Sequence, residues 1–74
     1  MEEKNFVLTE PFIRVDHLLQ NMGIAQSGGK AGFFIRNGLV KVNGKVSVEK
    51  RKKVLLDDEI NFDGQLLIRV KVPG

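Results

Sequence analysis

The spacing of apolar residues changes abruptly at Asn37-Gly38, and this change constrains the fold more than any other feature of the chain. Upstream, apolar residues recur at the three- and four-residue spacing of an amphipathic helix, as in Val15, Leu18, Leu19 and Met22. Downstream, apolar and polar residues alternate with the period of two that is typical of strands. The chain therefore predicts an α+β fold in which two packed N-terminal helices precede a small antiparallel β-sheet.

Local signals set the limits of the two predicted helices, which we place over about residues 15–22 and 28–37. Gly23 stands where a left-handed residue ends a helix. Ser27 is a good N-cap for the second helix. Because so few residues join the two segments, we expect them to pack as a helix–turn–helix pair.

The sheet is predicted around tight turns. Asn43-Gly44 predicts a two-residue hairpin, because both central positions of a type I′ turn need positive φ. Asp63-Gly64 predicts a second tight turn. The segments that we expect to be extended are residues 39–42, 45–48, 54–56, 59–62 and 65–72, with 6–8 as a lead-in, 49–53 as a loop and 73–74 as a free end.

Length and composition exclude several classes of protein. With 74 residues the chain can bury only one small core, so we expect a single domain over residues 1–74. It has no cysteine and one histidine, which argues against a disulfide framework and a metal cluster, and we expect no cofactor, no metal and no catalytic residues. Its apolar runs fall short of the ~20 residues of a membrane span. We expect a complete, soluble, cytoplasmic monomer that starts at Met1.

The distribution of charge is more informative than the net charge of +3. Residues 30–53 hold eight basic side chains and one acidic one, whereas the segments on either side are both net acidic. The basic residues are Lys30, Arg36, Lys41, Lys45, Lys50, Arg51, Lys52 and Lys53. Such segregation suits a polyanion such as nucleic acid, although residues 50–53 alone would also suit a solvated loop.

The start of the second helix has the composition of an anion site. Gly28 and Gly29 occupy the first turn, and Lys30 stands where a capping acid would be stabilising. A phosphate would explain this choice, because free N–H groups and a lysine would bind it. The alternative is that the glycines allow close packing of the two helices. Gly29 and Gly32 also form the GxxG of a KH-like nucleic-acid-binding module, which is a further alternative.

The order of these signals resembles one family. The chain reads Arg14-Val-Asp-His-Leu-Leu, Gly23-Ile24, Gln26-Ser27, Phe34-Ile35, Asn37-Gly38 and Leu39-Val-Lys-Val-Asn-Gly44, followed by Val54, Asp58 and Ile60. Over about residues 14–62 this resembles the S-four RNA-binding domain, named for the small-subunit ribosomal protein. The Gln26-Ser27-Gly28-Gly29 opening is most similar to small stand-alone bacterial members of the YaaA and YbcJ type.

The resemblance implies an αL-type RNA-binding motif that binds structured RNA with its two helices and its hairpin. Carried over by position, it implicates Arg14, Ser27, Lys30, Lys41, Asn43 and Lys45. Gly28 departs from the pattern, because the family usually has a basic residue after the serine. We therefore expect the contact there to come from the backbone or from Lys30.

We expect non-catalytic binding of ribosomal or transfer RNA, with association with the ribosome, through a basic face. The start of the second helix, the Asn43-Gly44 hairpin and the 50–53 loop would form this face. Its candidate residues are Arg14, Ser27, Gly28, Gly29, Lys30, Arg36, Lys41, Asn43, Lys45, Arg51, Lys52 and Lys53. The alternative is a protein–protein adaptor that docks an acidic partner. The chain has no tryptophan or tyrosine, so recognition should use RNA shape and backbone rather than base stacking. Phe33 is the one aromatic for which an exposed position is an alternative, but we expect it to be buried.

Overall fold

The computed structural model describes residues 1–73, which form two helices and seven strands. Their order is β1 (Glu2–Val7), β2 (Ile13–Arg14), α1 (Val15–Asn21), α2 (Gly28–Arg36), β3 (Val40–Val42), β4 (Lys45–Val46), β5 (Lys53–Val54), β6 (Glu59–Phe62) and β7 (Leu66–Lys71). Both predicted helices are confirmed to within a residue. Of the expected free end, Gly74 lies outside the described residues.

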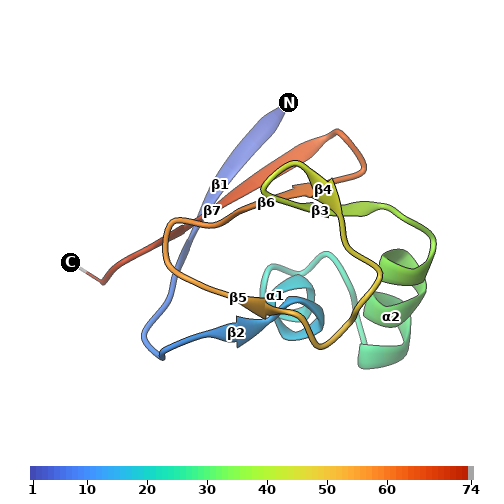
Figure 1. The fold of residues 1–74 in the computed structure, drawn as a ribbon, viewed down its shortest axis with the longest axis horizontal. Coiled ribbons are helices and arrows are strands. Elements are labelled where there is room, and N and C mark those ends of the chain that lie inside the picture. The colour runs from blue at the N-terminus through green and yellow to red at the C-terminus, as the bar shows by residue number, and fades with distance from the viewer. Residues whose placement is uncertain (74) are drawn as a thin grey trace.

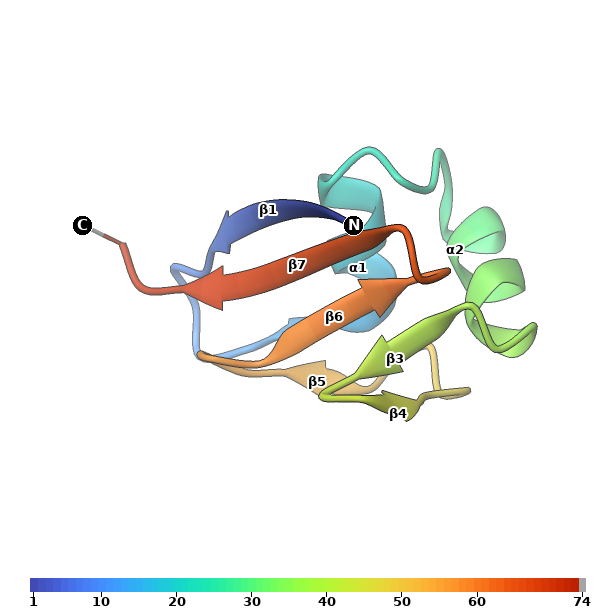
Figure 2. The same ribbon diagram turned by 90° about the horizontal axis from the view of Figure 1, so that it is seen from above.

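Five strands form one mixed sheet in the order β1-β7-β6-β3-β4 (Figure 2). The pairs β7–β6, β6–β3 and β3–β4 are antiparallel as predicted, but β1 pairs parallel with β7. The prediction of a purely antiparallel sheet that follows the helices is therefore wrong for β1. Its pairing with a strand about 60 residues away is a tertiary contact, and local sequence carries no signal for it.

Strands β2 and β5 form a separate two-stranded sheet, in which Ile13 pairs with Val54 and Arg14 pairs with Lys53. Lys53 therefore belongs to a strand rather than to the expected 49–53 loop. The Val15 N–H donates to the Lys52 carbonyl, 2.9 Å away, at the start of α1. These bonds fix the basic segment against the beginning of the first helix (Figure 1).

The hydrophobic core lies between the five-stranded sheet and the two helices (Figures 1 and 2). Leu18 and Leu19 of α1, Ile35 of α2, and Ile60 and Ile68 of the sheet are fully buried. Strand residues alternate between the two faces, so Lys41, Asn61 and Arg69 lie on the opposite face of the sheet. Burial of these apolar side chains orders the helices on the sheet and so fixes the position of α2.

The predicted turns are confirmed. Asn43 and Gly44 both have positive φ, 52° and 86°, and connect β3 to β4 as a two-residue hairpin. The Ser27 hydroxyl accepts a hydrogen bond of 3.1 Å from the Lys30 N–H, so Ser27 caps α2 as expected. Within residues 1–73, neither helix is long and apolar enough to cross a membrane.

Candidate nucleic-acid interface

The first turn of α2 is not crowded by neighbouring atoms. A β-carbon added to Gly28 would lie 3.7 Å from Nε2 of Gln20, which is an ordinary contact. A β-carbon on Gly29 would lie 3.9 Å from Oγ of Ser27. Both positions would accept alanine, which favours helix more than glycine by ~1 kcal/mol. Close helix packing therefore does not explain these glycines, and anion binding remains the prediction for this turn.

Two cationic side chains converge over Gly32, one turn further along α2. A β-carbon at this buried glycine would lie 3.3 Å from Nη1 of Arg36 and 3.7 Å from Cδ of Lys50. The side chain of Lys50 therefore reaches α2 from the 50–53 segment. Lys50 belongs to the 50–53 segment of the predicted basic face, although it was not named there as a single candidate residue. The sequence signal for this contact is Gly32, one turn before Arg36. A glycine there leaves room beside the guanidinium for another long side chain.

A shallow groove runs beside the β3–β4 hairpin and brings together two more predicted residues, Lys45 and Lys52. Val46 and Val48 also line this groove and are exposed. Arg51 is exposed in the adjoining turn. The groove therefore places Asn43, at the tip of the hairpin, next to Lys52 of the basic segment.

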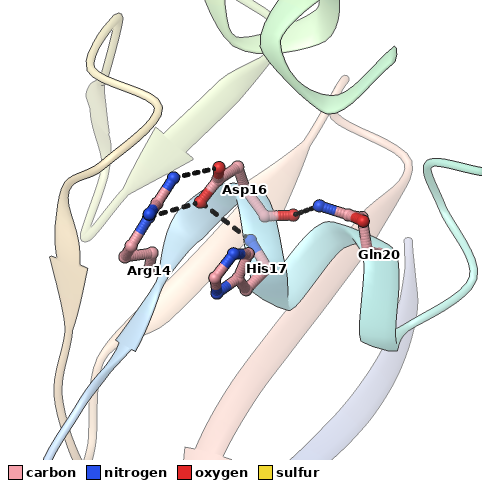
Figure 3. A network of polar contacts seen from close by, with 4 residues as sticks. All are labelled: Arg14, Asp16, His17 and Gln20. Atoms are coloured by element: carbon pink, nitrogen blue, oxygen red, sulfur yellow. Dashed lines mark hydrogen bonds and ion pairs between the residues drawn. The ribbon is translucent and has the colours of Figure 1, made fainter. Parts of the chain in front are cut away.

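Arg14 and Lys53 are register partners across β2 and β5. Nζ of Lys53 lies 4.8 Å from the centroid of the Phe12 ring, in a cation–π contact. The Arg14 guanidinium lies against the carboxylate of Asp16, with contacts of 3.1 Å from Nε to Oδ1 and 2.7 Å from Nη2 to Oδ2 (Figure 3). Part of the charge of Arg14 is therefore compensated within the fold.

Asp16 is 2% exposed and anchors this network (Figure 3). Its carboxylate also accepts a hydrogen bond of 2.9 Å from the His17 N–H. Burial raises the pKa of the Asp16 carboxyl. The hydrogen bond and the charge of Arg14 lower this pKa, as does the hydrogen bond from the His17 N–H, and these effects outweigh that of burial. The pKa lies below its ordinary value of 3.8, so Asp16 stays ionised and holds Arg14 in one orientation.

Two of the predicted residues are placed differently from the expected layout. Lys41 lies between the buried Val40 and Val42, so its side chain points to the sheet face opposite the helices. The structure therefore does not bring Lys41 together with the basic residues of α2. The side-chain amide of Asn43 is hydrogen-bonded within the chain at both its nitrogen and its oxygen. Its Nδ2 donates to Asp58 Oδ1 at 3.0 Å, and its Oδ1 accepts from the Glu59 N–H at 2.9 Å.

Phe33 is 50% exposed, so the expectation that it is buried is wrong. It lies on the outer face of α2, while the neighbouring Phe34 turns toward the core. Nζ of Lys30 lies 5.5 Å from the centroid of the Phe33 ring and 5.3 Å from that of Phe34. Within residues 1–73, no group of three or more His, Asp or Glu side chains is arranged to hold a metal ion.

Comparison with known proteins identifies close relatives. Residues 6–71 match the S4 domain family. The chain is 35% identical over 54 residues to YbcJ of Escherichia coli strain K12. The matched residues make up 73% of this chain and 77% of YbcJ. YbcJ of Shigella flexneri matches to the same extent. The solution structure of Escherichia coli YbcJ revealed an αL motif involved in RNA binding. It aligns with 97% of this chain and 89% of YbcJ, at 29% identity and a TM-score of 0.67.

Two larger proteins contain a similar fold. A pseudouridylate synthase aligns with 69% of this chain at 29% identity and a TM-score of 0.62, and the chain spans only 22% of that enzyme. The 30S ribosomal protein S4e from Thermoplasma acidophilum aligns with 76% of this chain at 27% identity and a TM-score of 0.57. The chain spans 30% of that protein. These matches favour the predicted S-four resemblance over the KH-like alternative. Since the family match covers most of its length, the chain belongs to the S4 domain family.

Proposed function

We propose that this protein binds structured RNA and catalyses no reaction itself. The observation that carries the proposal is the convergence of Arg36 and Lys50 over Gly32, which joins the basic residues of α2 to those of the 50–53 segment. Membership of the S4 domain family and the RNA-binding αL motif of YbcJ support it. Clustered cations attract the phosphates of a polyanion and give most of the affinity for it.

The proposed binding surface, which we call the cationic surface, extends from the start of α2 to the hairpin. Its side chains are Arg14, Lys30, Arg36, Lys45, Lys50, Arg51, Lys52 and Lys53, and the N–H groups of residues 28–30 complete it. Lysines dominate, and a lysine ammonium acts on phosphate as a point charge rather than as a planar fork. We therefore expect recognition of the shape and backbone of a folded RNA. In this proposal Asn43 shapes the hairpin, and Lys41 contributes less than the other lysines.

The proposed target is ribosomal or transfer RNA. Similarity to a 30S ribosomal protein supports ribosomal RNA and association with the ribosome. We further propose that the protein acts as a monomer in the cytoplasm. Crosslinking in cells, followed by sequencing of the attached RNA, would identify the target. Recovery of messenger RNA alone would contradict a ribosomal or transfer RNA target.

A charge-reversal experiment tests the cationic surface. Lys50→Glu with Lys52→Glu should weaken binding to a ribosomal RNA hairpin by a factor on the order of a hundred or more, since it removes two phosphate contacts and adds repulsion. Lys4→Glu with Lys71→Glu is the matched control, because both residues are exposed on strands β1 and β7 and the net charge changes equally. Equal loss in both variants would contradict the proposed surface.

A protein–protein adaptor remains the second candidate, because a basic surface can also dock an acidic partner. Pull-down from a cell extract with and without ribonuclease separates the two functions. RNA binding predicts that the captured material is lost after ribonuclease treatment. A partner that survives the treatment and is lost in the Lys50→Glu, Lys52→Glu variant would favour the adaptor.

A further inference from the structure

An aromatic ring lies among the cations of α2. Lys30, Phe33 and Arg36 are spaced three residues apart, so they lie on one face of the helix, and all three are exposed. A lone exposed phenylalanine is common on protein surfaces and means little by itself. Here the ring has a cation one turn before it and another one turn after it, in the middle of the proposed RNA surface.

The Phe33 ring is held in place by other rings. Its centroid lies 6.1 Å from that of Phe34, with the ring planes at 62° in an edge-to-face contact. Phe34 in turn meets Phe62 of β6 edge to face at 5.1 Å and 70°. Phe34 and Phe62 are partly buried against the core. A row of rings therefore runs from the sheet to the surface, so that Phe33 would lose little freedom when a ligand binds.

The surroundings of Phe33 distinguish between possible occupants. Protein–protein interfaces are depleted of lysine, which fits poorly with a ring that has Lys30 beside it. A nucleotide instead needs an aromatic face for its base and a cation for its phosphate. Nζ of Lys30 lies over the Phe33 ring, 5.5 Å from its centroid, in a cation–π contact. A base that stacks on this face would displace the ammonium from the ring toward the phosphate of the same nucleotide.

We propose that Phe33 is a stacking platform for one unpaired nucleotide of the bound RNA, whose phosphate pairs with Lys30. The preferred RNA is then a duplex with a bulged or looped-out base next to the contacted backbone. Unstacked bases are the part of a folded RNA that aromatic side chains can reach. This inference rests on the proposed function and adds base stacking to a surface that otherwise reads only shape and charge.

The test compares two synthetic RNA hairpins, one with an uninterrupted stem and one with a single unpaired 2-aminopurine in the same stem. Wild-type protein should prefer the bulged hairpin by a factor on the order of ten, from the energy of one base–aromatic stack. Stacking on Phe33 should also quench the fluorescence of the 2-aminopurine. Phe33→Leu should abolish both the preference and the quenching while it binds the uninterrupted hairpin as wild type does. Phe33→Tyr, which keeps an aromatic face, should retain both.

The outcomes separate this inference from the proposed function. If wild-type protein binds neither hairpin at low salt, the proposed function fails. If it binds both hairpins equally and Phe33→Leu changes neither, RNA binding stands and the stacking platform is wrong. Sedimentation of the free protein supplies one further outcome. Self-association that Phe33→Leu abolishes would make the ring a contact between copies of the chain and would overturn the inference.

Discussion

The guanidinium of Arg14, the residue directly before α1, donates two hydrogen bonds to the nearly buried carboxylate of Asp16. Asp16 is thereby tied to β2, and its own N–H donates to the Lys50 carbonyl at 3.2 Å. One acidic residue thus joins the first helix, the small sheet and the basic segment. The proposed RNA surface depends on this junction, because it fixes where residues 50–53 lie.

Replacement of Asp16 by asparagine should lower the free energy of unfolding by about 1–3 kcal/mol, since it leaves the part-buried Arg14 without its counter-charge. Urea unfolding followed by circular dichroism measures the change. Asp63→Asn is the matched control, because Asp63 is exposed in a turn with φ of 53°, a conformation that asparagine also accepts. An equal effect of both substitutions would contradict the role of the Arg14–Asp16 pair.

The same pair predicts a pH dependence. The pKa of Asp16 is lowered in the folded protein, so ionised Asp16 favours the folded state. This stabilisation is complete above the unfolded pKa of about 4 and is lost as the pH falls through the lower folded pKa. The difference in unfolding free energy between wild type and Asp16→Asn should therefore narrow below about pH 4. A difference that stays constant down to about pH 2 would contradict the lowered pKa.

Asn43 should stabilise the hairpin in two separable ways. Its side chain bonds Asp58 and the Glu59 N–H, and its backbone has a positive φ of 52°. Asn43→Ala loses both contributions and should cost about 1–3 kcal/mol, whereas Asn43→Gly loses only the side-chain bonds and should cost less. Thermal unfolding compares the two variants. Equal destabilisation would show that the backbone conformation contributes nothing.

The glycines of α2 predict opposite effects on stability and binding. Gly28→Ala with Gly29→Ala should raise the free energy of unfolding by up to about 1 kcal/mol per site, because both β-carbons fit and alanine favours helix. If phosphate approaches the N–H groups of this turn, the same methyl groups should weaken RNA binding. Melting curves and RNA titrations of one preparation check both effects. Unchanged RNA affinity would remove the first turn of α2 from the proposed surface.

Lys30 and Lys41 should differ in their effect on RNA binding, although sequence placed both on one face. Lys30 lies on α2 beside the exposed ring, whereas the side chain of Lys41 lies on the opposite face of the sheet from the helices. Lys30→Glu should therefore weaken RNA binding much more than Lys41→Glu, with little change in melting temperature for either. Each phosphate contact that is lost should flatten the slope of log affinity against log salt by about 0.7–0.9. A larger loss for Lys41→Glu would reverse this assignment.

Sequence predicted the features that depend on neighbouring residues. The Ser27 cap, the end of α2 near Asn37-Gly38 and the Asn43-Gly44 hairpin follow from local backbone preferences, and all three are observed. The parallel partner of β1 could not be predicted, because it depends on contacts between the two ends of the chain.

The candidate surface was predicted less completely than the fold. Lys45 and Lys52, which the sequence assigned to the basic face, line one groove. The contact of Lys50 with α2 and the exposure of Phe33 depend on tertiary packing. Residue type alone favoured burial of Phe33. In the structure the adjacent Phe34 packs against the core instead.

The parallel pairing of β1 with β7 has a consequence for synthesis of the chain. β1 is made before its partner β7, so it stays unpaired until β7 has left the translating ribosome. The helices and the hairpin need only short-range contacts and can form sooner. The charged residues Glu2, Glu3 and Lys4 of the unpaired β1 disfavour its pairing with another nascent chain. Completion of the sheet therefore has to follow synthesis of β7.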